Sequence, residues 1–206
     1  ALLAGTSAVR PITVHSGSES LTTVAASIPG EPWTTLPRNQ RIMTDRVSQY
    51  ALLAAASALA DAGLDVANED RARIGVSMGT CMGGILSTEQ AYEDLFRKGL
   101  TRVSPVTLIK TMYNAPVAQI CLLHGLTGPS LTYSTTCSSS AVAAGEAMRQ
   151  IRHGYADVMI AGGAEALLTF GSIKAWQALQ LLAPGLSDHP EASCRPFRAD
   201  RCGTVI

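Results

Sequence analysis

Residues 130–148 read SLTYSTTCSSSAVAAGEAM and change from a strand pattern to a helix pattern at Cys137. Residues 130–136 are rich in β-branched and aromatic side chains, which favour a strand. Residues 138–148 are nearly all small, and they predict a helix that neighbouring backbones can approach closely. The first N–H groups of such a helix have no intrahelical partner, and the helix dipole stabilises an anion there. Cys137 is therefore placed where the thiolate, the nucleophilic form of cysteine, is favoured.

A buried structural cysteine is the alternative interpretation of Cys137, because free cysteine is among the most buried residue types. The sequence that follows favours the nucleophile. A second apolar strand is predicted at residues 157–161, and it ends in the pair Gly162-Gly163. The order strand, cysteine, helix, strand is a βαβ unit whose reactive group lies at the carboxyl end of the first strand, where α/β sheets usually present active sites.

The composition indicates a soluble α/β protein. The chain has 206 residues, of which 47% are hydrophobic and 16% charged, and its formal net charge is zero. A neutral chain has no general attraction to nucleic acid or to an anionic membrane. No apolar run approaches the roughly 18 residues of a membrane span. Five irregularly spaced cysteines do not indicate a disulfide framework, so we expect a cytoplasmic protein.

Predicted strands alternate with predicted helices, which indicates a largely parallel sheet covered on both faces. We see no linker, so residues 1–206 are expected to form part of one domain with no internal boundary. Residues 13–37 are rich in Ser, Thr and Pro and predict irregular surface with one short strand. Asp45 is the expected cap of the first long helix. The predicted helices are 46–62, 86–98, 114–124, 138–152 and 171–182, and the predicted strands are 74–78, 131–136 and 157–161.

Further short motifs occur at wide separation. They are Asp45-Arg46-Val47-Ser48-Gln49-Tyr50-Ala51, Gly79-Thr80-Cys81-Met82-Gly83-Gly84, Ser104-Pro105 with Asn114, Gly128-Pro129-Ser130 running to Thr135-Thr136-Cys137-Ser138-Ser139-Ser140, and Ala156-Asp157-Val158 through Gly162-Gly163-Ala164-Glu165 followed by Arg195-Pro196-Phe197-Arg198-Ala199-Asp200-Arg201. In this order and spacing they resemble the β-ketoacyl synthases, the thiolase-fold condensing enzymes of fatty-acid and polyketide synthesis. The match is to the elongating group, which works on acyl carrier protein, and it corresponds to the N-terminal half of the family's domain.

The resemblance implies a thiolase-like fold, a layered α/β arrangement with a mixed, mainly parallel sheet, of which only the N-terminal half is represented. It implies that Cys137 carries the acyl group as a thioester and that its backbone N–H is one donor to the oxyanion. Met82 would face the acyl tunnel, with ordinary core packing as the alternative. Residues around Thr107 of a partner subunit would line the same pocket. The resemblance implies no cofactor and no metal.

The implied function is an acyltransferase activity, the decarboxylative Claisen condensation of an acyl-cysteine enzyme with malonyl-acyl carrier protein to give β-ketoacyl-acyl carrier protein. In the family a second half supplies two catalytic histidines, a lysine and a Gly-rich Phe loop, and none of these motifs occurs in this chain. The expected partners are acyl carrier protein carrying acyl and malonyl groups, and a second ketosynthase-type subunit. The resemblance implies a homodimer or heterodimer paired through the strand at 131–136, and the alternative is that this strand lies inside one subunit's own sheet.

Two other functions compete with this one. A non-catalytic partner subunit resembling a chain-length factor is the first, and the retention of Cys137 speaks against it. A degradative, thiolase-like acyltransferase is the second, and the elbow sequence fits the synthases better. The chain departs from the family at Thr136, where alanine is common, and at Cys202 and Thr204, where aspartate and an aromatic residue are usual. These departures concern substrate class and carrier docking rather than the nucleophile.

The other cysteines and the Gly-rich turn have plainer interpretations. Cys81 and Cys121 are interpreted as core residues. Cys194 and Cys202 are interpreted as incidental thiols, because metal-ligand spacing is absent around them. The turn at residues 79–84 lacks the Lys and Ser/Thr of a phosphate-binding loop, which excludes nucleotide binding there.

The histidines and one arginine cluster have no assigned catalytic role. His124 and His153 each precede a glycine at a predicted helix end, where a partial positive charge is favourable. Arg38, Arg41 and Arg46 cluster before a helix. This cluster suits an acidic acyl carrier protein, and a solvated helix start is the alternative.

Overall fold

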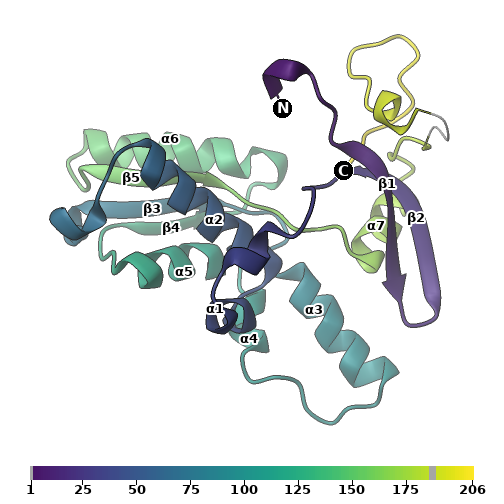
Figure 1. Cartoon of the computed structure of the whole chain (residues 1–206), viewed down its shortest axis with the longest axis horizontal. Helices are drawn as coiled ribbons and strands as arrows, with labels where there is room; N and C mark the ends of the chain where they lie inside the picture. Colours follow the sequence, from purple (N-terminus) through teal and green to yellow (C-terminus); the bar gives the residue numbers. More distant parts are fainter. Residues whose placement is uncertain (1, 186–188) are drawn as a thin grey trace. The chain divides into compact units, whose positions relative to one another are not determined.

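The computed structural model describes residues 2–185 and 189–206 and divides into two compact units, shown in Figure 1. The larger unit is Trp33–Ala166, and the smaller unit combines Ala1–Pro32 with Leu167–Ile206. Each unit is described by itself below. The expectation that residues 1–206 belong to one domain stays a prediction.

A three-stranded parallel sheet forms the centre of the larger unit. Strand β3 (Ile74–Gly79) lies between β4 (Ser130–Tyr133) and β5 (Val158–Gly163). Every residue of β3 is buried, which is the pattern of a strand covered on both faces. The predicted parallel sheet is confirmed, and within the described residues β4 is an edge strand that pairs with β3 alone.

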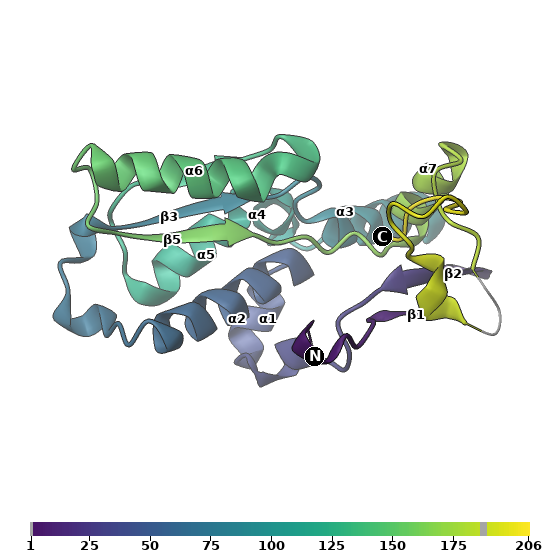
Figure 2. The ribbon, with the colours of Figure 1, turned by 90° about the horizontal axis from the view of Figure 1, so that it is seen from above.

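Helices cover both faces of this sheet, as Figure 2 shows. Helix α6 (Ser139–Arg152) packs on one face, and α2 (Arg46–Asp61) and α5 (Ala115–His124) pack on the other. The buried face of α6 presents Ala143 and Ala147 to the strands. Their small size lets the helix approach the sheet closely, as the sequence predicted.

A buried hydrogen bond fixes α6 to the central strand. The Ser77 hydroxyl of β3 donates to the carbonyl oxygen of Ala143 over 2.8 Å. On the opposite face, aliphatic side chains from the strand and from α2 and α5 form the apolar core. Its most deeply buried members include Leu52, Val76 and Ile120.

The helix ends follow the predicted capping residues. Asp45 caps α2 by accepting a hydrogen bond from the Val47 N–H at 3.1 Å, and it also accepts one from the Ser87 N–H at 2.7 Å. The second bond ties the start of the next long helix to the first. Gly125 ends α5 in the left-handed conformation, with φ at 65°.

The remaining elements of the larger unit are short. The helix predicted at 86–98 is confirmed as α3 (Ile85–Tyr92), which continues into a π-helical turn, η5 (Glu93–Arg97). Two short helices, α1 (Arg38–Met43) and α4 (Thr107–Thr111), were not predicted. Short 3₁₀ turns join these elements: η2 (Pro32–Thr35), η3 (Val66–Asn68), η4 (Arg71–Arg73) and η6 (Thr136–Ser138).

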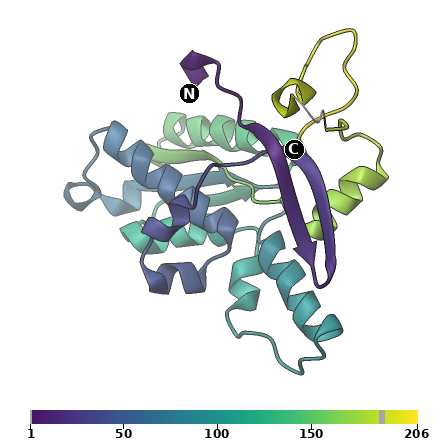
Figure 3. The same ribbon diagram turned by 45° about the vertical axis from the view of Figure 1, so that its right-hand side comes forward.

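The smaller unit contains an antiparallel hairpin of β1 (Val9–Ser16) and β2 (Glu19–Ala26), drawn in purple in Figure 3. The prediction of irregular surface at residues 13–37 is therefore wrong for this segment. Ile12, Val14 and Leu21 lie on the half-buried face of the hairpin, and polar pairs such as the Thr13 and Thr22 hydroxyls, 3.0 Å apart, lie on its exposed face. Gly17, with φ at 57°, makes the tight turn.

Helix α7 (Phe170–Ala178) and the 3₁₀ turns η1 (Leu2–Ala4) and η7 (Pro190–Ser193) complete the smaller unit. Helix α7 ends earlier than predicted because the chain turns at Gln180, whose φ is 56°. The chain end returns to the hairpin, where the Ala26 N–H donates to the Ile206 carbonyl at 2.7 Å. In the described part of the chain, no helix is both long and apolar enough to cross a membrane.

Candidate active site

Cys137 lies on a sharp elbow between β4 and α6. The strand ends at Tyr133, the chain forms η6, and α6 begins at Ser139. Thr136, the residue before the cysteine, has φ at 53°. A β-branched residue in the left-handed region is a backbone outlier, and such outliers concentrate at functional sites. The Cys137 side chain is exposed at this point, beyond the carboxyl end of its strand.

Ser139 holds the elbow in shape. Its hydroxyl accepts a hydrogen bond from the Thr135 N–H at 2.9 Å and donates to the Thr136 carbonyl at 2.6 Å. Ser138 adds a third bond, from its hydroxyl to the Thr135 carbonyl at 2.8 Å. Ser139 itself is buried, whereas its partners Thr135 and Thr136 are exposed, so these bonds are partly buried. The sequence predicted a strand running directly into a helix. It did not predict the hydrogen bonds by which these two serines hold the elbow.

Two glycines let the neighbouring strands reach the elbow. A side chain at Gly79, the last residue of β3, would collide with the backbone of Ser139. A Cβ atom on Gly163, the last residue of β5, would lie 2.6 Å from the Cβ of Ser140. The carboxyl ends of both strands therefore meet the first turn of α6 at backbone contact, and the site is assembled from three strands.

The Gly-rich turn after β3 is held by Glu165, which follows β5. One carboxylate oxygen, Oε2, accepts from the N–H groups of Cys81 at 2.6 Å and Met82 at 3.2 Å. The Thr80 hydroxyl lies 3.4 Å from the other oxygen, Oε1, and accepts from the Gly83 N–H at 3.2 Å. The sequence placed Glu165 in a motif but gave it no role.

The second thiol in this region belongs to Cys81. Its pKa is raised, chiefly by burial, then by the negative charge of Glu165, and also by Cys137. Cys81, Glu165 and Cys137 are therefore close enough to interact electrostatically. Cys121 packs against the apolar core and has its Sγ 3.3 Å from the Ser130 hydroxyl oxygen. Cys81 is only partly buried and borders the elbow, so it is less of a core residue than the sequence suggested.

Met82 and Thr107, the two predicted substrate-binding residues, lie on adjoining segments. Met82 is 36% exposed in the Gly-rich turn, and the two glycines after it pack against Tyr113 and the Lys110 carbonyl, at the end of α4. Thr107 begins α4 and lines a cavity of about 360 Å³ together with Asp45. Neither Met82 nor Cys137 lines that cavity. Within one chain Met82 therefore lies in the Gly-rich turn beside the end of α4, and Thr107 lines a cavity that includes neither Met82 nor Cys137.

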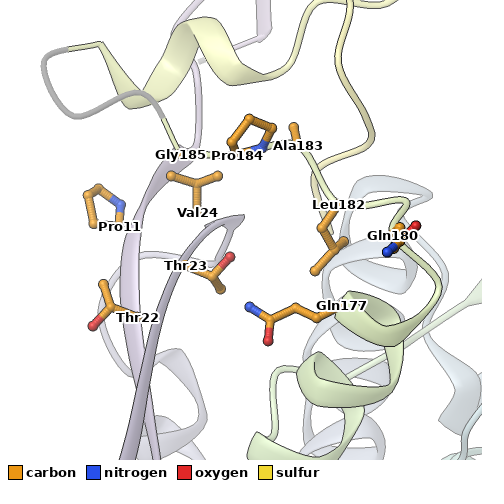
Figure 4. A pocket seen from close by; sticks show the side chains of 10 residues that line it. All are labelled: Pro11, Thr22, Thr23, Val24, Gln177, Gln180, Leu182, Ala183, Pro184 and Gly185. Carbon is orange, nitrogen blue, oxygen red and sulfur yellow. The ribbon is translucent and has the colours of Figure 1, made fainter.

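A second cavity, of about 440 Å³, lies in the smaller unit and is shown in Figure 4. Its polar side chains are Thr22, Thr23, Gln177 and Gln180. The ten labelled residues include no ionisable side chain and none of the predicted site residues. The described lining of this cavity therefore supplies neither a thiol nor an ionisable general base for acyl transfer.

His124 and His153 occupy helix ends, as predicted. His124 is the last residue of α5, and His153 caps α6. Burial lowers the pKa of His124, so desolvation opposes the positive charge that the helix end would favour. Within residues 2–185 and 189–206, no three His, Cys, Asp or Glu side chains are grouped as metal ligands would be.

Only part of the predicted arginine cluster is exposed to solvent. Arg46 stacks on Trp33, with its guanidinium carbon 3.2 Å from the ring centroid. Arg41 is half-buried and Arg38 is exposed. The stacked Arg46 stabilises the start of α2 through a cation–π contact, which favours a structural role for that member of the cluster.

Comparison with known proteins gives the family. Residues 5–206 match the family model described as "Beta-ketoacyl synthase, N-terminal domain". Nodulation protein E of Rhizobium leguminosarum bv. trifolii is 37% identical over 202 residues, covering 98% of this chain and 49% of the relative. A 3-oxoacyl-[acyl-carrier-protein] synthase 2 of Coxiella burnetii is 33% identical over 207 residues, covering 100% of this chain and 50% of the relative.

Solved structures agree with this result. A β-ketoacyl synthase from Burkholderia phymatum STM815 matches with a TM-score of 0.78 and 30% identity, over 98% of this chain and 50% of the other. A complex of a type II polyketide synthase acyl-carrier protein with its ketosynthase matches with a TM-score of 0.68 and 27% identity, over 74% of this chain and 43% of the other. The chain spans about half the length of the curated relatives it matches. It belongs to the β-ketoacyl synthase family and has the layered, thiolase-like α/β fold of that family's N-terminal domain.

Proposed function

We propose that the full-length protein condenses an acyl group with malonyl-acyl carrier protein, and that Cys137 is the residue that carries the acyl group. The observation that supports this most is the elbow. An exposed thiol follows a strained Thr136 and precedes a long helix, at the carboxyl edge of a parallel sheet. A strained backbone persists only where its surroundings hold it, and here Ser139 does so.

The first step is transfer of the acyl group to the enzyme. The Cys137 thiolate attacks the carbonyl carbon of an acyl thioester and forms a tetrahedral oxyanion. The oxyanion collapses, the new C–S bond to Cys137 remains, and the carrier thiolate leaves and takes up a proton. The backbone N–H of Cys137 is the proposed donor to the oxyanion from this chain. Sulfur suits the role because it is both a good nucleophile and a workable leaving group.

The second step is condensation. Malonyl-acyl carrier protein loses CO₂ and becomes an enolate, which attacks the acyl-cysteine carbonyl. The C–S bond to Cys137 breaks, and β-ketoacyl-acyl carrier protein is released. Decarboxylation is proposed to depend on two histidines that the family supplies outside residues 1–206. Acyl carrier protein is the proposed carrier because one relative's name and one solved complex contain it.

We further propose that the active assembly is a dimer, either of two copies or of this protein with a ketosynthase-type partner. The edge position of β4 supports the proposal, because an uncharged edge strand is prone to pair with another chain. In such a dimer the Thr107 region of the partner would line the acyl pocket. Within one chain the cavity that Thr107 lines includes neither Met82 nor Cys137, which is compatible with that arrangement.

The test is to identify the acylated residue. Full-length protein is incubated with a radiolabelled acyl-acyl carrier protein and digested, and the labelled peptide is sequenced. We expect the label on Cys137, no label in Cys137→Ser, and normal labelling in the matched controls Cys81→Ser and Cys121→Ser. Label on Cys81 or Cys121 with Cys137 unmodified contradicts the assignment. A wild-type protein that takes no label but restores activity to a second subunit would be a chain-length-factor-like partner instead.

A further inference from the structure

We infer that Glu165 is a positioning residue that fixes the turn Thr80–Gly84, and through it the Met82 side chain, for acyl chains of a particular length. The inference rests on the proposed function, because it concerns the chain carried by Cys137. Glu165 itself does not need to touch the substrate.

The geometry of the hydrogen bonds carries the argument. A single carboxylate oxygen of Glu165 accepts from two consecutive backbone N–H groups, those of Cys81 and Met82. Two consecutive N–H groups can converge on one oxygen only if the backbone between them is curved. Because the acceptor is charged, these bonds are stronger than bonds between neutral groups. The carboxylate therefore stabilises one conformation of the turn around Met82.

The far side of the turn is fixed through Thr80. Its hydroxyl can donate to Glu165 Oε1 at 3.4 Å while accepting from the Gly83 N–H at 3.2 Å. The N–H groups on both sides of Met82, those of Cys81 and Gly83, are therefore hydrogen-bonded. The first bonds directly to the Glu165 carboxylate, and the second bonds to it through the Thr80 hydroxyl.

Glu165 is itself attached to the sheet. It follows β5 by two residues, and the intervening Ala164 donates its N–H to the Gly79 carbonyl at 3.1 Å. The carboxylate is thus supported by the same strand that leads into the turn. The raised pKa of Cys81, to which the Glu165 charge contributes, agrees with a carboxylate held beside the turn.

Met82 is the part of the turn that remains adjustable. Its backbone N–H is held by Glu165, but its side chain is 36% exposed and has three rotatable bonds. A fixed backbone limits the volume that the side chain can reach. Loosening the backbone would let Met82 retreat and would admit longer chains.

The test uses the full-length protein and three variants: Glu165→Gln, Glu165→Ala and the matched control Glu146→Gln. Glu146 lies on α6 and pairs with Arg149. The first readout is hydrogen exchange of the peptide that contains Cys81 and Met82. We expect exchange at least about tenfold faster in Glu165→Ala, a smaller increase in Glu165→Gln, which keeps an acceptor oxygen but loses the charge, and no change in Glu146→Gln.

The second readout is the rate of acylation of Cys137 as a function of acyl chain length. We expect Glu165→Ala to raise kcat/KM for long chains relative to short ones, mainly through KM, with little change for the shortest chain. In a Met82→Ala background the same substitution should cause no further shift, because its effect passes through Met82. A general loss of rate at every length would show a merely structural role and would overturn the inference.

The two proposals fail in different ways. Unchanged exchange at Cys81 and Met82 in Glu165→Ala overturns the positioning role, whatever the activity. Faster exchange with an unchanged length profile overturns the link to acyl length while the condensing function stands. Absence of any acylation of wild-type Cys137 overturns the proposed function and with it the acyl-length role, while the exchange readout still decides whether Glu165 holds the turn.

Discussion

At the scale of single residues, small polar side chains hold the backbone of the elbow in place through hydrogen bonds to main-chain groups. Ser139 has the side chain of a surface residue, yet it is 4% exposed and bridges the Thr135 N–H and the Thr136 carbonyl. The strained φ of Thr136 is tolerated because these two bonds hold the backbone in place on both sides of it. The reactive position of Cys137 is therefore set by a neighbour that does no chemistry.

We predict that Ser139→Ala lowers the free energy of unfolding by about 1–3 kcal/mol, because the Thr135 N–H loses its buried acceptor. Acylation of Cys137 should slow as the elbow relaxes. Denaturant unfolding and the labelling rate measure the two effects. Ser140→Ala is the matched control and should change stability by less than about 0.5 kcal/mol, since Ser140 is exposed. Equal effects of the two substitutions would show that the bridge does not hold the elbow.

Met82 is predicted to limit the length of the acyl chain. Met82→Ala should shift acylation and products towards longer chains, and Met82→Trp towards shorter ones. Burial of one methylene contributes roughly 0.8 kcal/mol, so a change of two carbons shifts preference by about tenfold. Product lengths are measured by mass spectrometry of the carrier-bound chains. The same product profile in both variants would rule out this role.

At the scale of secondary-structure elements, the long buried segments could be predicted and the short polar ones could not. The βαβ unit around Cys137 was correct in order and type because apolar strands, capping residues and glycines act locally. The β1–β2 hairpin was missed because its apolar alternation, Ile12 and Val14 opposite Leu21, is short and lies in a segment rich in Ser and Thr. Helices α1 and α4 were missed because each is short and contains no buried residue, so neither gives an apolar periodicity.

The candidate site was likewise predicted where its residues form local motifs, and not where it depends on contacts between distant parts of the sequence. Cys137 and the Gly-rich turn could be found because both stand at strand ends in recognisable motifs. The bonds of Glu165 could not, because they join residues 84 and 83 positions apart in the sequence. The strain at Thr136 was equally hidden, since the sequence there reads simply as strand.

At the scale of the whole molecule, the direction of hydrogen-bonding groups on β4 bears on assembly. The carbonyls of Pro129 and Tyr133 accept bonds from the Val76 and Thr80 N–H groups of the β3 side. Backbone groups alternate along a strand, so odd-numbered residues face β3 and Thr132 faces the open edge.

We therefore predict that Thr132→Pro weakens dimerisation while leaving the fold of each subunit intact, because it removes an N–H from the outer edge only. Leu131→Pro is the contrasting variant, and it should destabilise the subunit by breaking the bond to β3. Sedimentation of the full-length protein measures assembly, and circular dichroism measures folding. A wild-type monomer with full condensing activity at micromolar concentration would contradict the proposed dimer.

The backbone contact of Gly79 and Gly163 with the start of α6 also decides how such a protein could be redesigned. In a mutant library that randomises every residue near Cys137, most members would carry a substitution at one of these two glycines. Any side chain added there would push the helix, and the thiol beside it, out of place, so those members would be inactive. Met82 presents an exposed side chain to vary instead. Diversity concentrated there would sample new substrates while the architecture of the nucleophile stays constant.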